Sequence, residues 1–189
     1  MTPPDQPPAP RIAGALTVSL DGFLGPDGDG IFWPRPCEAI DPGHRRFLDS
    51  VGTVVMGRGA YERKRATTNG EPAFPGRDVI VVTSTPLPRA AERTVAWHNG
   101  LPLLIQRLTT ERRGGPAFIL GGPRLSNAFI AAGAIDQLDI FVVPGLAGSG
   151  IPLSQGLPAQ VRLALVSSKV VGDGVVRLRY RPPALLRAA

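Results

Sequence analysis

The sequence predicts an α/β protein with one mixed, mainly parallel sheet, helices on both faces and an antiparallel hairpin at the C-terminus. Between residues 12 and 132, short apolar runs alternate with segments of helical periodicity, a pattern typical of a parallel sheet with crossover helices. From residue 138 onward, alternating strands and the turn Gly172-Asp173-Gly174 predict the hairpin. The length of 189 residues suits a single domain with a full core.

The first elements are a strand, a glycine-rich loop and a helix. Residues 12–20 are apolar and β-prone, and we expect this strand to be central, flanked by the strands that end at Met56 and Leu120. Residues 22–30 contain four glycines, which favours a mobile flap. Asp41-Pro42 supplies the N-cap and the first-turn proline of a helix.

The middle of the chain repeats these patterns. Apolar, β-branched runs predict strands over residues 53–56, 78–83 and 94–97. Helical spacing predicts a helix over residues 101–108, and we expect a short helix over residues 58–66.

Residues 117–132 form the clearest unit of strand, turn and helix. Residues 117–120 are an apolar run, Gly121-Gly122 is a turn, and Pro123 suits the first turn of a helix. Such a turn directs unpaired backbone N–H groups and the positive end of the helix dipole at one point, where a nucleotide phosphate can bind. A tight turn without a ligand is the alternative interpretation.

The last elements are strands, and the ends of the chain are predicted to be flexible. Alternation predicts strands over residues 138–142, 161–165 and 175–180. Residues 1–10 contain five prolines and predict a disordered leader rather than a signal peptide. We expect residues 11–182 to form one domain and residues 183–189 a flexible tail.

The composition argues against several classes of function. Net charge is +6, but the arginines are scattered and no basic stretch is interleaved with aromatic residues, so we expect no nucleic-acid partner. No segment is long enough to span a membrane. The single cysteine, Cys37, and the two histidines predict neither a disulfide nor a zinc site. These features predict a cytoplasmic protein with no bound metal.

Ligand-binding residue types follow three of the predicted strands. One strand ends in Gly57-Arg58, a second in Thr83-Ser84-Thr85 and a third in Gly121-Gly122. In open α/β sheets, ligands bind beyond the carboxyl ends of the strands. A guanidinium, a group of hydroxyls and two bare backbone turns therefore predict a dinucleotide phosphate site. Each feature also has a simpler explanation, as a turn, a surface charge or a cap.

A series of short motifs now points to a known family. In chain order these are Ser19-Leu20-Asp21-Gly22, Val55-Met56-Gly57-Arg58 with Tyr61-Glu62, Pro75-Gly76-Arg77, Val82-Thr83-Ser84, Leu120-Gly121-Gly122, Ile135-Asp136-Gln137-Leu138 and Val143-Pro144. The chain resembles the dihydrofolate reductase-like superfamily. It is most similar to the C-terminal reductase domain of the bifunctional riboflavin-biosynthesis deaminase–reductase. The resemblance covers residues 11–182 and implies a stand-alone reductase-domain protein.

The resemblance implies NADPH as the cofactor and a homodimer as the assembly. By position, Arg58 with Ser84 nearby would face the adenosine 2′-phosphate, and Thr17 and Leu24 would approach the nicotinamide. The pyrophosphate region would be held by Gly121, Gly122, Arg124 and Leu125, after Leu120 at the strand end, and the adenosine half would be lined by Gly57, Gly59, Ala60, Thr83 and Thr85. Ala60 stands where the family usually has Thr or Ser, and Gly59 replaces a frequent basic residue.

Candidates for the chemistry lie between the first strand and the second. Asp41 is a candidate for substrate binding or proton supply, since it falls near the pterin-binding carboxylate of dihydrofolate reductases; the alternative is a plain N-cap. Asp21 is the other candidate carboxylate, with a turn residue as its alternative. Trp33, Phe47 and His44 could line a pocket for a flat heterocycle or belong to the core.

We therefore expect an NADPH-dependent oxidoreductase that transfers a hydride to a pterin-like or pyrimidine-like heterocycle or to a ribosylamino-pyrimidine. The alternative is a nucleotide-binding module of the same fold without catalytic activity.

Overall fold

The structure is a computed structural model, which describes residues 10–25, 41–68, 71–72, 74–87, 93–111 and 114–181. The predictions for the leader up to residue 9, for the glycine-rich loop from residue 26, for Trp33 and Cys37, and for the tail from residue 182 lie outside these residues.

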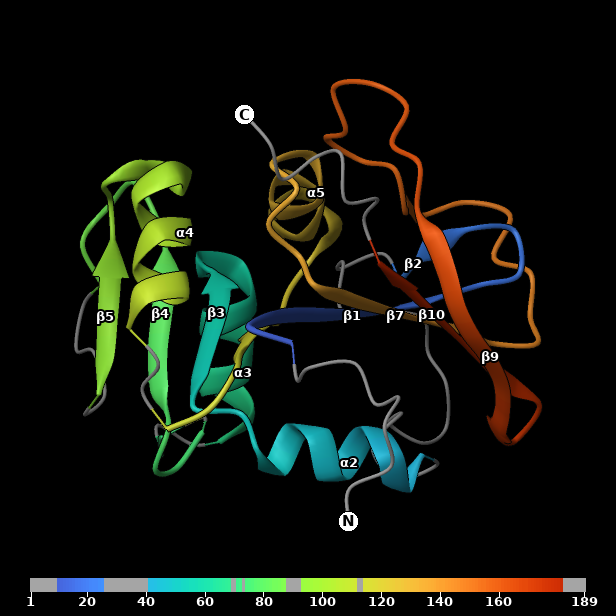
Figure 1. Ribbon diagram of the computed structural model, residues 1–189, viewed down its shortest axis with the longest axis horizontal. Coiled ribbons are helices and arrows are strands. Elements are labelled where there is room, and N and C mark those ends of the chain that lie inside the picture. The colour runs from blue at the N-terminus through green and yellow to red at the C-terminus, as the bar shows by residue number, and fades with distance from the viewer. Residues whose placement is uncertain are drawn as a thin grey trace, which may run out of the picture.

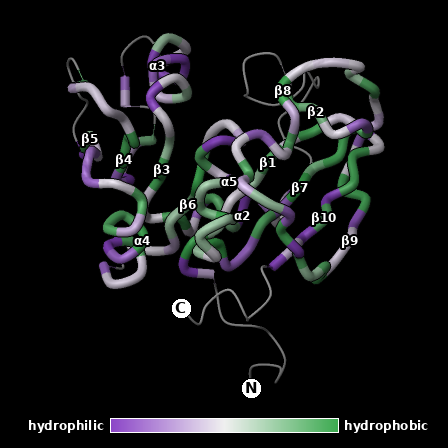
Figure 2. Tube along the Cα trace, turned by 90° about the horizontal axis from the view of Figure 1, so that it is seen from above, coloured by the Kyte–Doolittle hydropathy of each residue, from purple (hydrophilic) through white to green (hydrophobic). Residues whose placement is uncertain are grey.

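The described residues form an eight-stranded sheet with four helices and a separate pair of short strands (Figure 1). The strands of the main sheet are β1 (Ile12–Val18), β3 (Thr53–Gly57), β4 (Asp78–Val82), β5 (Thr94–Trp97), β6 (Ala117–Ile119), β7 (Gln137–Val142), β9 (Ala164–Gly172) and β10 (Val175–Arg181). The helices are α2 (Pro42–Asp49), α3 (Arg58–Thr67), α4 (Gly100–Thr110) and α5 (Pro123–Ala131). The short strands β2 (Phe23–Leu24) and β8 (Ile151–Pro152) pair with each other and lie side by side in Figure 2.

The main sheet has the strand order β5-β4-β3-β6-β1-β7-β10-β9. The strands from β5 to β7 are parallel, and β10 runs antiparallel to both β7 and β9. The predicted class, a mixed and mainly parallel sheet with a C-terminal antiparallel hairpin, is therefore confirmed. The predicted neighbours of the first strand were wrong in one respect: β1 pairs with β6 and β7, and β6 separates it from β3.

Helices cover both faces of the sheet, as predicted. On one face, Leu104 and Leu108 of α4 and Phe129 of α5 pack against the buried strand residues Ile80 and Ile119. On the other face, the helices α2 and α3 cover a second cluster that contains Val54, Met56, Val81 and Tyr61. Apolar residues on both faces explain why the central strands are continuous hydrophobic runs rather than alternating ones.

The C-terminal hairpin begins later than the sequence pattern predicts. Residues 161–163 are not in a strand, and β9 starts at Ala164, which pairs with Arg181 at the far end of β10. The alternation at Val161 and Leu163 instead reflects side chains that pack against the core outside any strand. The strand β9 forms one edge of the sheet, opposite β5, and its first seven residues are exposed.

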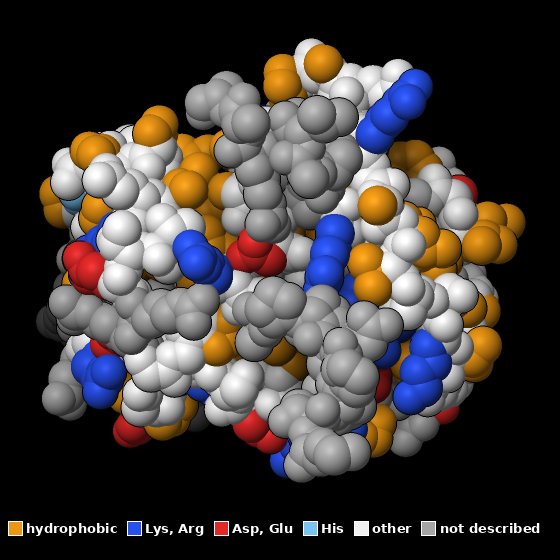
Figure 3. All heavy atoms as spheres, in the orientation of Figure 1, with side chains coloured by type: hydrophobic (Ala, Val, Ile, Leu, Met, Phe, Trp, Pro, Cys, Tyr) orange, Lys and Arg blue, Asp and Glu red, His pale blue; other side chains and the backbone are white. Residues whose placement is uncertain are grey.

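None of the described helices is long and apolar enough to cross a membrane. On the face shown in Figure 3, basic side chains are distributed among polar and hydrophobic ones.

Candidate functional site

The three predicted ligand-binding segments lie together at the carboxyl-terminal edge of the sheet, where the parallel strands end. Since β3 lies between β4 and β6 and all three are parallel, the segments that follow their carboxyl ends are neighbours. These segments start at Gly57, Thr83 and Leu120. The Leu120 N–H donates to the Val55 carbonyl at 2.8 Å, which ties the end of β6 to β3.

The two glycine turns touch each other. A Cβ atom placed on Gly121 would lie 3.7 Å from the backbone nitrogen of Gly57 and 3.9 Å from the Cβ of Ala60. Gly121 has a φ of +153°, a conformation that side chains rarely adopt, so a glycine is needed at this position. The added Cβ would itself make only ordinary van der Waals contacts, so the backbone conformation is what favours glycine here.

Both helices begin without a side-chain cap at this point. The N-cap residues are Gly57 for α3 and Gly122 for α5, and neither start has a side-chain capping hydrogen bond. The first N–H groups of a helix need an acceptor, and an anion at a helix N-terminus provides one. Two uncapped helix starts beside two glycine turns form a cradle whose chemistry fits a pyrophosphate.

Arg58 lies in the first turn of α3, and its guanidinium reaches the segment after β4. Its Nη1 donates to the Thr85 hydroxyl and, at 3.4 Å, to the Pro86 carbonyl, and its Nε pairs with Glu62 at 2.7 Å. The Thr83 hydroxyl in turn accepts from the Thr85 N–H at 3.2 Å. The predicted proximity of Arg58 to the Thr83–Thr85 segment is therefore seen, with Thr85 rather than Ser84 as the contact.

The other predicted cofactor residues are distributed around this edge. Gly59 and Ala60 lie in the first turn of α3, and Arg124, which is exposed, and Leu125, which packs against the core, lie in the first turn of α5. Thr17 is half-buried in β1. Leu24 is buried in β2 and packs in the main core.

Asp41 lies at the amino end of α2 and is fully buried. Its Oδ1 accepts from the Gly43 N–H at 3.0 Å, which is the predicted capping bond. Its Oδ2 forms an ion pair with the Arg177 guanidinium of β10. Asp41 is therefore held on one side by the backbone of its own helix and on the other by a cation from β10.

A second ion pair, between the buried Asp139 and the half-buried Arg179, lies next to this one. Asp139 of β7 accepts from Arg179 Nε at 2.7 Å and from Arg179 Nη2 at 2.8 Å, and these two residues are directly opposite each other in the ladder. The Asp139 carboxylate raises the pKa of the Arg179 guanidinium. The Nδ1 atom of His44 lies 4.0 Å from Asp139 Oδ2.

Arg177, Arg179 and Asp139 were not predicted as site residues. The two arginines are two positions apart on β10 and so share a face of the strand. That spacing is visible in the sequence, but the register that brings them to Asp41 and Asp139 is not.

His44 and Phe47 of α2 lie in an aromatic cluster. The His44 ring meets the Phe141 ring edge to face at a centroid distance of 4.9 Å, and the Phe47 ring meets the Phe118 ring at 6.0 Å. The cluster fills the space between α2 and the sheet. His44 is buried and Phe47 is half-buried, so the ring faces in these contacts belong to the hydrophobic core.

Asp21 ties the turn after β1 to the loop after β7. Its carboxylate accepts from the Ala147 N–H at 2.9 Å and the Gly148 N–H at 2.7 Å. Hydrogen bonds from the Ser19 hydroxyl and from these two amides lower the pKa of Asp21 to about 2. The carboxyl is therefore ionised at neutral pH, which suits an anchor and not a proton donor.

Comparison with known proteins agrees with this architecture. The family model described as the RibD C-terminal domain matches residues 10–177. The uncharacterized protein YwjB of Bacillus subtilis is 34% identical over 168 residues, which cover 87% of this chain and 94% of YwjB.

Two solved structures share the fold. A putative riboflavin biosynthesis protein from Shewanella has a TM-score of 0.72 at 23% identity, covering 90% of this chain and 98% of its own. Dihydrofolate reductase from Enterococcus faecalis, solved with NADP(H), has a TM-score of 0.63 at 20% identity, covering 91% and 96%. These likenesses confirm the dihydrofolate reductase-like fold, and the match over most of the sequence identifies the chain as a member of the RibD C-terminal domain family.

Proposed function

We propose that the protein is an NADPH-dependent reductase of a pterin-like or pyrimidine-like heterocycle, with a ribosylamino-pyrimidine included in that class. The observation that carries the proposal is the contact between the Gly57 and Gly121 turns at two uncapped helix starts. Membership of the RibD C-terminal domain family and the likeness to a dihydrofolate reductase solved with NADP(H) support it.

The proposed cofactor site has two parts, one for the pyrophosphate and one for the 2′-phosphate. The starts of α3 and α5, with Gly121 and Gly122, would hold the pyrophosphate through backbone N–H groups. Arg58, oriented by Thr85 and Glu62, would pair with the 2′-phosphate through charge-assisted hydrogen bonds. When bound, NADPH supplies the hydride.

In this proposal, neither Asp21 nor Asp41 donates the proton that the reduction requires. Asp21 is ionised and tied to two backbone amides, and both oxygens of Asp41 already accept from protein groups. Asp41 would therefore position the substrate as a hydrogen-bond acceptor that Arg177 holds in place. A water molecule would then deliver the proton.

The same observation favours the alternative, a nucleotide-binding module without chemistry. NADPH oxidation in the presence of pterin-like and pyrimidine-like heterocycles, followed together with NADPH binding, separates the two. Binding with turnover supports the reductase, binding without turnover of any such substrate supports the module, and absence of NADPH binding contradicts both.

A further inference from the structure

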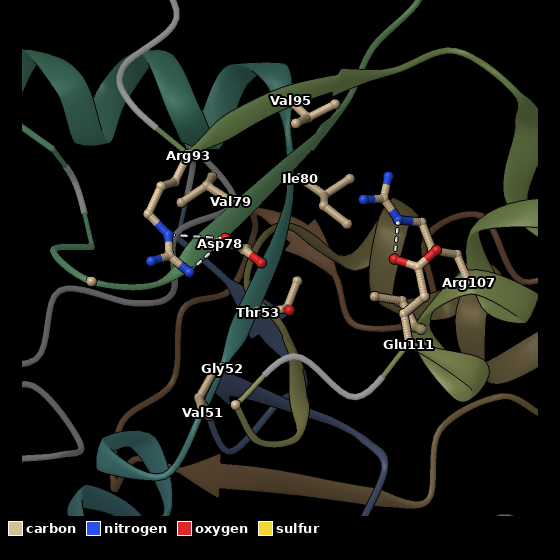
Figure 4. A pocket seen from close by; sticks show the side chains of 13 residues that line it. Val51, Gly52, Thr53, Asp78, Val79, Ile80, Arg93, Val95, Arg107 and Glu111 are labelled. Atoms are coloured by element: carbon tan, nitrogen blue, oxygen red, sulfur yellow. Dashed lines mark hydrogen bonds and ion pairs between the residues drawn. The ribbon is translucent and has the colours of Figure 1, made fainter.

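A cavity lies at the end of the sheet opposite the glycine turns. It has a volume of ≈ 660 Å³ and is lined by residues from the amino ends of β3 and β4, from β5 and from the last turns of α4 (Figure 4). Thr53 of its lining begins β3, whereas Gly57 ends that strand, so the cavity lies roughly 13 Å from the proposed cofactor edge. A cavity of this size is comparable to small-molecule sites, which span roughly 300–1,000 Å³.

One wall of the cavity contains Arg107, whose guanidinium is held in place by neighbouring side chains. The Arg107 guanidinium lies over the Trp97 ring, 5.5 Å from its centroid, and its Nε pairs with Glu111 at 3.2 Å. Trp97 is itself fixed, because its Nε1 donates to the Gly100 carbonyl at 2.8 Å. Within the described ranges, the two terminal amino groups of Arg107 form no hydrogen bond. A guanidinium held by stacking and by its Nε retains a fork that binds a carboxylate at little entropic cost.

The facing wall contains an ion pair between Arg93 and Asp78, whose opposite charges cancel. Arg93 contacts Asp78 Oδ1 through both Nε, at 3.0 Å, and Nη2, at 2.9 Å. Among the described residues of the lining, the two arginines and the two carboxylates sum to zero, and the carboxylates of Asp78 and Glu111 would repel a ligand of high negative charge. The site therefore suits a single negative charge on the ligand.

Five of the other described lining residues are aliphatic: Val51, Val79, Ile80, Val95 and Leu108. Ile80 and Leu108 are buried and lie on the α4 side of the sheet, and Val51 closes the cavity near the start of β3. Val95, which is 45% exposed, is a large apolar residue left at the rim. Apolar surface next to an arginine fork matches a ligand that has a carboxylate and a hydrophobic body.

We propose that this cavity is a second binding site, separate from the nucleotide turns, for small monocarboxylates with an apolar body. Arg107 binds the carboxylate through its terminal amino groups, and Ile80, Leu108 and Val95 contact the hydrophobic part. The proposal does not depend on the cofactor site, because no residue of that site lines the cavity.

Calorimetric titration of the full chain with phenylpropionate tests the proposal. Saturable binding is expected for phenylpropionate and not for phenylpropanol, which lacks the charge, or phenylpropylamine, which inverts it. Inorganic phosphate, which has the charge without the apolar body, should not compete. Absence of saturable binding, equal binding of the alcohol, or competition by phosphate would overturn the proposal.

Substitutions of Arg107 test whether phenylpropionate binds in this cavity. Arg107→Gln should weaken phenylpropionate binding about tenfold or more, because a charge-assisted pair is lost. Arg107→Lys, which keeps the charge and loses the fork, should fall in between. Arg46→Gln, which changes an exposed arginine of α2, is the matched control and should bind like the wild type. Thermal unfolding checks that each variant is folded, and equal binding by folded Arg107→Gln would contradict the assignment.

Discussion

The Asp41 carboxylate at the amino end of α2 forms an ion pair with the Arg177 guanidinium of β10, although the two residues are 136 positions apart. Asp41 is fully buried, and the Arg177 side chain is 11% exposed. The pair attaches α2 to the antiparallel end of the sheet. Asp41 is therefore both the cap of its helix and the partner of a buried cation.

The ion pair changes what substitution of Asp41 should do. Asn caps helices well, so capping alone would leave the stability of Asp41→Asn nearly unchanged. Because the substitution leaves Arg177 buried without its counter-charge, we expect the free energy of unfolding to fall by about 3 kcal/mol. Urea unfolding of Asp41→Asn, Arg177→Met and the double variant measures this. The double variant should lose less than the sum of the single variants, and strict additivity would contradict the coupling.

Turnover should separate the structural role of Asp41 from a role toward substrate. If Asp41 contacts the substrate, Asp41→Asn should lower turnover at least about tenfold. Arg177→Met keeps the carboxylate but loosens it, so its main effect should be on KM. Turnover in folded Asp41→Asn equal to that of the wild type would reduce Asp41 to a cap and an ion-pair partner.

The low pKa of Asp21 predicts a specific acid sensitivity. Its pKa is lowered to about 2 in the folded chain, from an ordinary value of 3.8. A depressed carboxyl pKa stabilises the fold above the ordinary value, and that contribution is lost as pH falls through about 4 toward about 2. Asp21→Asn should remove this dependence, so the stability difference between wild type and variant should shrink over that range. Hydrogen exchange at Ala147 and Gly148 should be faster in the variant at neutral pH, and unchanged exchange would show that the anchor is dispensable.

The edge strand β9 predicts self-association. Leu165, Val166 and Val170 are 56%, 45% and 68% exposed on this strand, and exposed apolar edges are usually covered. We propose a homodimer through this edge. Light scattering at micromolar concentration should give the dimer mass, and Val170→Glu should give the monomer mass. Leu103→Glu on α4, where Leu103 is 53% exposed, is the control that should remain dimeric. A monomeric wild type would refute the proposal.

Local sequence signals predicted the elements well where chain neighbours determine the structure. The unit around Gly121 and Gly122 begins its helix at Pro123, as expected, and Gly133 follows it with a φ of 63°. Strand order was harder, because whether β6 or β3 lies beside β1 depends on contacts between distant segments.

The site was predictable only in part for the same reason. Gly57, Arg58 and Gly121 follow strand ends, so a rule about parallel sheets brings them together. Arg177 and Arg179 are recognised as partners of Asp41 and Asp139 only once the register of β10 on β7 is known. The sequence alone does not show that Arg177 contacts the Asp41 carboxylate.

Calorimetric comparison of NADPH with NADH tests the central claim most directly. Arg58 should form charge-assisted hydrogen bonds with the 2′-phosphate, worth roughly 1.5–3 kcal/mol each, so NADPH should bind at least about tenfold more tightly than NADH. Arg58→Gln should abolish that difference while leaving NADH affinity unchanged, and Arg46→Gln should preserve it. Equal affinity of the wild-type chain for the two cofactors, or failure to bind either, would contradict the account.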